Sequence, residues 1–193
     1  MLDADLNLHF SLKWGDFIKA EHGSSKAETG IIGQPFPEIK SKSLSGRVLT
    51  LPEEVKGKVV LVCIAFMRST QSMINSWVQP FEQEFGKDGR FAVYEVPMIN
   101  AGWKIFSGMI DSGMRGGIPA EKHGRVVTFY GDYSGYQKTL GMENTNLAYI
   151  FLLDQEGIIR WKGQGHSSPE TEKELLKAAM TLKPVLSNNR SFK

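Results

Sequence analysis

Residues 59–66, VVLVCIAF, form an uncharged apolar run that passes through a short polar bend into a helical pattern. An unbroken run rich in branched side chains is typical of a strand buried on both faces of a mostly parallel sheet. After the bend, apolar residues recur at intervals of three and four, which places them on one side of a helix whose first turn is residues 69–72. That side consists of Met73, Ile74, Trp77, Val78, Phe81 and Phe85. The pattern predicts a strand–turn–helix unit.

Further strands are expected on both sides of this unit. Residues 33–58 place two prolines around Phe36 and predict an entry hairpin, because prolines are tolerated at sheet edges and strand starts. Residues 154–157, with Asp first and Gly last, predict a turn between two strands. The remaining strand candidates are apolar runs bounded by turn residues: 91–96, 126–130, 148–153 and 158–161.

Two more helices are expected in the second half of the chain. Tyr133, Tyr136 and Leu140 fit a short helix, and Ser167 or Ser168 is a suitable cap for a final one. The buried side of the final helix is expected to hold Leu175, Leu176, Ala179 and Leu182.

This order of elements predicts an α/β protein with a thioredoxin-like fold, a mixed central sheet flanked by helices. Residues 33–182 are expected to form that domain, with a helical and loop insertion at about 97–125. The expected flanking parts are an N-terminal extension of residues 1–32 and a C-terminal tail of residues 183–193.

The bend after the first buried strand reads Arg68, Ser69, Thr70, Gln71 and Ser72. Thioredoxins and peroxiredoxins hold their reactive cysteine at this place, where the start of a helix stabilises a thiolate. The bend of this chain contains no thiol. Its serines would need an adjacent base to act as nucleophiles, so we expect them to cap the helix.

Arg68 beside the helix start leaves a second possibility open for the bend. Backbone N–H groups and the positive end of a helix bind anions such as phosphate or carboxylate. Arg68, Ser69 and Ser72 are therefore a possible anion site, and the chain would then be an anion- or small-ligand-binding module of thioredoxin-like fold.

Cys63, the single cysteine of the chain, lies inside the apolar run. A reactive thiol requires exposure and a positive electrostatic field, and a buried cysteine behaves as a small apolar side chain. We expect the second behaviour. The alternative is a peroxiredoxin-like thiol oxidoreductase that uses Cys63.

Composition argues against several other classes of function. A net charge of +2 provides no basic surface for nucleic acid, and no apolar run approaches the length of a membrane span. One cysteine excludes an internal disulfide, and the histidines show no ligand spacing, so we expect no metal site and no cofactor. The histidines are His9, His22, His123 and His166.

The insertion carries apolar side chains at helical spacing, followed by a glycine-rich stretch that we expect to be a loop because Gly113, Gly116, Gly117 and Pro119 interrupt the pattern. Two interpretations are open: a satellite core, or a soft apolar binding surface of the kind methionines provide. The binding surface would consist of Trp103, Phe106, Met109, Met114 and Arg115, with Lys104 beside them.

Several blocks of sequence together resemble the mitochondrial ATP synthase assembly factor family. The resemblance covers roughly residues 33–182 and contains no catalytic residue. The blocks are VCIAF (62–66), MINSWVQPF (73–81), VYEV (93–96), GMRGGIP (113–119), VVTFYGD (126–132) and YIFLLDQEGIIRWKGQG (149–165).

The resemblance implies a non-catalytic, thioredoxin-like chaperone for the membrane-embedded subunit a, also called subunit 6, of the ATP synthase proton channel. It also implies peripheral contact with the mitochondrial inner membrane from the matrix side, and it leaves the oligomeric state open. Residues 1–32 contain five acidic and three basic side chains, unlike an Arg-rich, acid-poor transit peptide. The proline that thioredoxins hold in cis is also absent from residues 144–147.

Overall fold

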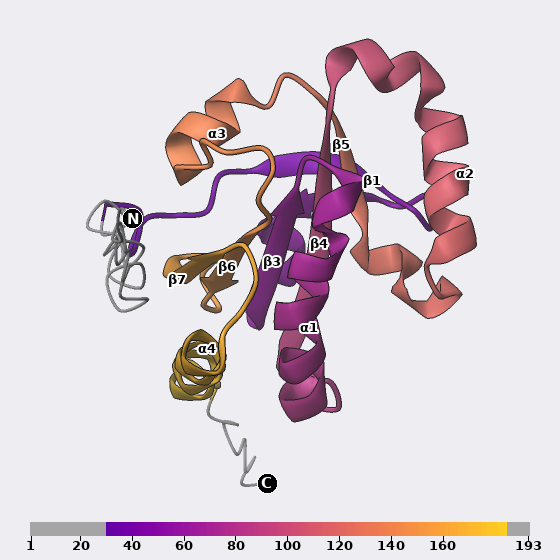
Figure 1. Ribbon diagram of the computed structural model, residues 1–193. Coiled ribbons are helices and arrows are strands. Elements are labelled where there is room, and N and C mark those ends of the chain that lie inside the picture. Colours follow the sequence, from indigo (N-terminus) through magenta and orange to yellow (C-terminus); the bar gives the residue numbers. More distant parts are fainter. Residues whose placement is uncertain (1–29, 185–193) are drawn as a thin grey trace, which may run out of the picture.

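The computed structural model describes residues 30–184, which form a mixed sheet with helices on both faces (Figure 1). In this part of the chain the sheet has seven strands in the order β2-β1-β5-β4-β3-β6-β7. The strands are β1 (Ile39–Ser43), β2 (Val48–Leu51), β3 (Val59–Ala65), β4 (Phe91–Asn100), β5 (Val127–Gly131), β6 (Tyr149–Leu153) and β7 (Ile159–Gln164).

The central strands are parallel and the outer strands are antiparallel. β3 pairs in parallel with β4, and β4 with β5. β6 and β7 add antiparallel strands beside β3, and β1 and β2 form an antiparallel hairpin beside β5. The predicted mixed sheet and the predicted entry hairpin at its edge are therefore confirmed.

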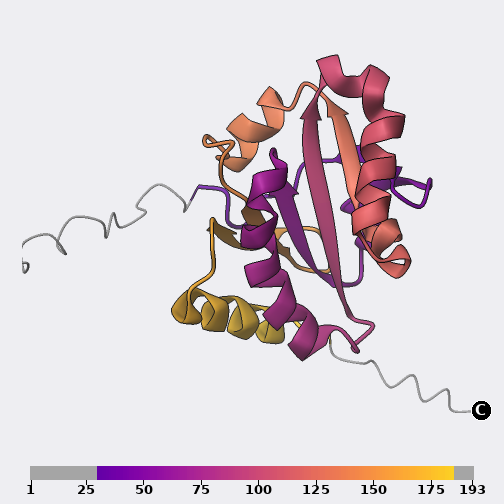
Figure 2. The same cartoon turned by 45° about the vertical axis from the view of Figure 1, so that its right-hand side comes forward.

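β3 is the centre of two cores, one on each face of the sheet. Val60, Val62 and Ile64 pack on one face, which the short helix α3 (Ser134–Leu140) covers with Leu140. Leu61 and Cys63 pack on the other face under α1 (Gln71–Phe85) and α4 (Pro169–Thr181), which lie close together in Figure 2. The strand is completely buried except at its last residue, as its apolar sequence predicts.

α1 contains an internal proline, Pro80, and still continues to Phe85. A proline lacks the N–H that would bond the carbonyl four residues earlier, here that of Ser76. The Ser167 hydroxyl donates a hydrogen bond to this Ser76 carbonyl oxygen at 3.0 Å. The turn between β7 and α4 thereby supplies the donor that Pro80 lacks, and it fixes α4 beside α1.

The final helix begins as predicted. Ser168 is the N-cap of α4, and Ser168 and Thr171 form a reciprocal capping box. Leu175 and Ala179 are fully buried against the sheet, and Leu182 packs partly buried beside them.

The insertion differs from the expectation. The predicted strand 91–96 continues to Asn100, and the chain then forms the 3₁₀ segment η3 (Ala101–Phe106), the helix α2 (Ser107–Gly117) and the 3₁₀ segment η4 (Ala120–Arg125). The prediction that the glycine-rich stretch forms a loop was wrong, because α2 passes through Gly113 and Gly116 to Gly117.

Contacts with the domain help to hold this glycine-containing helix in place. Each interior glycine costs a helix about 1 kcal/mol relative to alanine. The Tyr130 hydroxyl of β5 donates to the Asp111 carboxylate at 2.7 Å, and the Arg115 guanidinium donates to the Leu44 carbonyl oxygen at 3.3 Å. These tertiary contacts, which no local pattern reveals, favour the helix over a loop.

Candidate functional site

The apolar side chains of η3 and α2 lie largely in solvent. No residue of either segment is buried. The exposed fraction is 83% for Ile105, 69% for Met109, 58% for Trp103 and 45% for Phe106. The insertion therefore forms no satellite core. Trp103 and Phe106 lie against each other with ring centroids 6.0 Å apart.

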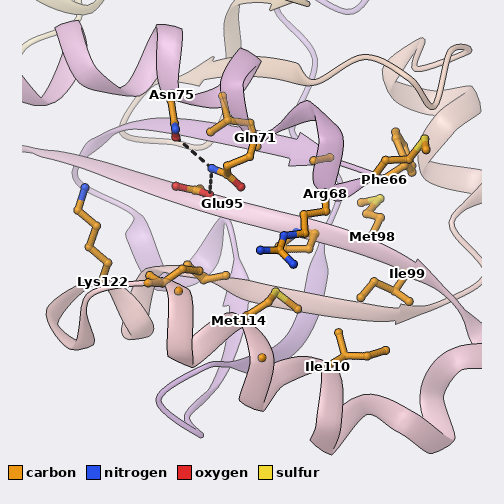
Figure 3. Close-up of a pocket in the computed structure, with 18 of the residues that line it drawn as sticks. Phe66, Arg68, Gln71, Asn75, Glu95, Met98, Ile99, Ile110, Met114 and Lys122 are labelled. Carbon is orange, nitrogen blue, oxygen red and sulfur yellow. Dashed lines mark hydrogen bonds between the residues drawn. The ribbon is translucent and has the colours of Figure 1, made fainter.

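Beside this exposed surface, a groove lies between the start of α1 and α2, over the C-terminal half of β4 (Figure 3). Its volume is about 860 Å³. Most of its lining is apolar and comes from three elements that are far apart in the sequence. The principal apolar residues are Ile74 from α1, Ile99 from β4, and Met109, Ile110 and Met114 from α2.

One wall of the groove carries a polar pair. Gln71, the first residue of α1, donates hydrogen bonds to the Glu95 carboxylate and to the Asn75 side-chain oxygen, both at 3.1 Å. Burial raises the pKa of Glu95, the hydrogen bond from Gln71 and the positive charge of Lys122 lower it, and the net shift is upward. Lys122 is held 2.7 Å from the Glu82 carboxylate.

Arg68 reaches the same groove. Its side chain points into the groove beside Gln71 and Glu95 (Figure 3). Among residues 30–184, no hydrogen bond or ion pair holds its guanidinium group. The site therefore offers a cation without a carboxylate partner, a partly buried carboxyl group and an adaptable apolar wall.

The two serines of the bend lie exposed outside this groove. The prediction that Ser69 or Ser72 caps the helix was wrong. Thr70 is the N-cap of α1, and its side chain accepts no capping bond. Its hydroxyl donates to the Met67 carbonyl oxygen at 2.7 Å. The 3₁₀ segment η2 (Arg68–Thr70) precedes α1 and displaces both serines from the cap position.

Cys63 is fully buried, as expected from its place in β3. Burial raises the pKa of its thiol well above the ordinary value, and the negative charges of Glu95 and Glu82 raise it further. A thiol in this setting stays protonated and out of reach of substrates.

The structure thus brings together some of the predicted residues and separates others. Arg68, Met109 and Met114 line one groove, whereas Trp103 and Phe106 lie outside its lining. Arg115 is also outside, where it anchors α2 to the loop at Leu44.

Sequence reasoning missed most of the groove lining, including three polar or charged side chains. Gln71, Glu95 and Lys122 come from a helix, a strand and a 3₁₀ segment, and only the fold brings them together. The available signal was Glu95 itself, a single acid inside the apolar stretch FAVYEVPM. A charge within a buried strand demands a partner or a function.

Two classes of feature do not occur between residues 30 and 184. This part of the chain contains no cluster of three or more metal-ligating side chains. It also contains no helix of the length and apolar character needed to cross a membrane.

Similar solved structures establish the fold. The exposed lipoprotein thioredoxin Etrx1 of Streptococcus pneumoniae is 13% identical with a TM-score of 0.52, covering 76% of this chain and 100% of that one. The thioredoxin domain of a thiol-disulfide oxidoreductase from Bacteroides vulgatus is 21% identical with a TM-score of 0.51, covering 76% and 96%. BsSco, of the Sco family of cytochrome c oxidase assembly proteins, is 9% identical with a TM-score of 0.53, covering 81% and 97%.

At these identities the likeness concerns the fold alone, and it confirms the predicted thioredoxin-like fold. Comparison with curated proteins finds none that matches the chain. The sequence pattern described as ATP10 protein matches residues 33–182, which span the sheet, all four helices described above and the groove. The chain belongs to the ATP10 protein family and is an ATP synthase assembly factor with a thioredoxin-like fold.

Proposed function

We propose that this protein is a non-catalytic chaperone that binds subunit a, or subunit 6, the membrane-embedded subunit of the ATP synthase proton channel. The proposed client surface is the exposed apolar part of the insertion, with Trp103, Ile105, Phe106 and Met109. Family membership supports a role in ATP synthase assembly. The choice of subunit a rests on the resemblance of the sequence blocks and is the part to be tested.

The observation that carries this proposal is the exposure of large apolar side chains on two consecutive segments, η3 and α2. Single exposed apolar residues are ordinary, but neighbouring ones mark a surface that binds a protein or a membrane. Each such side chain gains about 1.5–3 kcal/mol on full burial, so a partner that covers several of them binds favourably. Membrane subunits present matching apolar surface before their neighbours arrive.

The state of the single thiol supports a role without redox catalysis. Peroxiredoxin-like chemistry would require an accessible thiolate, whereas the Cys63 thiol is buried and its pKa is raised. The bend before α1, where a reactive cysteine would be expected, carries Arg68 and Ser69 instead.

We further propose that the protein works at the matrix side of the mitochondrial inner membrane as a peripheral protein. The ATP10 family points to the mitochondrion. Lys104 stands between Trp103 and Ile105 in η3, and a cation beside aromatic side chains suits the boundary between anionic headgroups and acyl chains.

A second candidate function is favoured by Arg68, whose guanidinium has no ion-pair partner among the described residues. It is the binding of a small anion at the start of α1. The melting temperature of the wild type should rise with phosphate or succinate, and this rise should disappear in Arg68→Ala. An equal rise in both proteins, or no rise in either, excludes the function.

The chaperone function is tested by replacing Trp103, Ile105 and Phe106, which belong to η3 and do not line the groove, together with serine. We expect unchanged melting, because all of these side chains are exposed, together with a loss of proton-channel assembly in mitochondria that depend on this protein. The control replaces Val48 and Met180, exposed apolar residues elsewhere, with serine. Normal assembly with the first variant, or an equal loss with the control, contradicts the proposal.

A further inference from the structure

We infer that the groove between α1 and α2 is a binding site for one apolar α-helix of the client. The backbone of that helix approaches closely at Gly113 and Gly117, and a donor side chain on it contacts Glu95. The inference rests on the proposed chaperone function and names the part of the client that is bound. It assigns a role to a glycine pair, a carboxyl group and a groove.

The glycines of α2 are placed for close approach. Gly113 and Gly117 are four residues apart, so they lie on one side of the helix, and both line the groove. A Cβ atom added to either would meet no atom within 4 Å beyond the neighbouring backbone of the helix itself. The space beside them is therefore open to a partner, and the internal packing of the domain does not require glycine at these positions.

Glycines with this spacing have a known physical use. Two small residues at positions i and i+4 let the backbone of a second helix approach closely, and this spacing recurs where helices associate in membranes. Glycine inside a helix otherwise costs stability, by about 1 kcal/mol relative to alanine. The cost at Gly113 is explained if the site receives a helix.

The size and lining of the groove agree with such an occupant. A helix about 10 Å wide rises about 1.5 Å per residue, so a volume of about 860 Å³ accommodates roughly two turns. Met109 and Met114 flank the glycines on α2, and their unbranched side chains adapt to different partner surfaces.

Glu95 gives the groove a preference for the charge of the bound helix. Its Oε2 atom accepts a bond from Gln71, and no other side-chain hydrogen bond to its carboxylate occurs within residues 30–184. Lys122 is nearby but is already paired with Glu82. Arg68 also points into the groove, so the preference concerns only the part of the guest that lies next to Glu95. A cationic or N–H-bearing side chain placed there would bond the other oxygen of the Glu95 carboxylate, whereas an acidic side chain there would be repelled.

An acyl chain is the competing occupant for an apolar groove. It would fill the space beside Met109 and Met114 equally well, but it has no backbone and gains nothing from two glycines spaced four residues apart. The glycine pair therefore favours a helix over a fatty acid.

The test uses the full-length protein and synthetic peptides in detergent micelles. The probe is a 20-residue helix of Leu and Ala with Lys at both ends and one Lys at its centre. Matched peptides carry Leu or Glu at the centre. Binding is followed by fluorescence anisotropy of a dye on the peptide.

The protein variants are Gly113→Leu and Gly116→Leu. Gly116 lies in the same helix, has equally open surroundings and does not line the groove, so it controls for the gain in helix propensity. We expect Gly113→Leu to weaken binding at least tenfold and Gly116→Leu to leave it unchanged, with neither variant melting below the wild type. Glu95→Gln should abolish the preference for the central Lys over the central Glu.

Equal binding by the wild type and Gly113→Leu, or equal weakening by both leucine variants, overturns the inference. Absence of peptide binding to the wild type overturns it as well, and so does complete displacement of the peptide by one equivalent of oleate, which assigns the groove to an acyl chain. These failures are distinct from failure of the chaperone proposal, because client capture through the exposed surface of η3 is measured separately in mitochondria.

Discussion

The Gln71 amide nitrogen lies 3.1 Å from Glu95 Oε2, and this hydrogen bond joins the first residue of α1 to β4. In a redox-active thioredoxin fold, the start of this helix stabilises a thiolate. Here the same place stabilises a carboxyl group that faces an apolar groove. We propose that this end of the fold serves as a binding surface with different chemistry.

The raised pKa of Glu95 predicts a dependence of stability on pH. Burial raises the folded-state pKa above the ordinary value of 4.5, so the folded protein holds this proton more tightly than the unfolded chain does. The contribution of Glu95 to the free energy of unfolding therefore falls as pH rises from about 4.5 through the raised pKa.

Urea unfolding at a series of pH values checks this, with Glu95→Gln as the comparison. The difference in unfolding free energy between Glu95→Gln and the wild type should grow in favour of the variant across that window and stay constant above it. A difference that does not change with pH, or one that shrinks as pH rises, would contradict the assignment.

Because Ser167 bonds the Ser76 carbonyl that Pro80 leaves without a donor, we expect the effects of substitutions at positions 167 and 80 on the free energy of unfolding to be coupled. Ser167→Ala removes the hydroxyl that bonds this carbonyl and should cost about 1 kcal/mol of unfolding free energy. The loss should be smaller in a Pro80→Ala background, because an alanine N–H at position 80 reaches the same carbonyl.

A double-mutant cycle in urea measures this coupling between Ser167 and Pro80. Additive effects of the two substitutions would show that the Ser167 hydroxyl does not replace the missing helix bond.

The burial of Cys63 predicts slow thiol chemistry. Native protein should react with a thiol reagent only as fast as it opens, whereas urea-unfolded protein should react at the rate of a free thiol. Cys63→Ala should lower the unfolding free energy by about 1 kcal/mol, as expected for deletion of one small buried group. Native labelling as fast as unfolded labelling would refute the buried, inert thiol.

The local parts of the fold could be predicted from the sequence because their causes are local. The run around Cys63 contains no polar residue and therefore predicts a buried strand. Ser168 indicates the start of α4, because a serine at this position can cap a helix. The turn at Gly157 was visible for the same reason, since this glycine has a φ of 82°, which other residues rarely adopt.

The groove could not be predicted, because its causes are tertiary. The glycines at 113 and 117 indicate a loop by local propensity, whereas the bonds of Asp111 and Arg115 with the rest of the domain favour a helix. Glu95 gave a signal in the sequence, but its partner Gln71 is 24 residues away and belongs to another element.

The most direct measurement is site-specific photocrosslinking in mitochondria that are synthesising their own proteins. A photoreactive amino acid replaces Met109 on α2 or, as the control, Met180 on α4, and both positions are exposed. If the insertion captures the client, position 109 crosslinks to newly made subunit a before the proton channel is assembled and position 180 does not. Equal crosslinking from both positions, or a crosslink from position 180 alone, would contradict it.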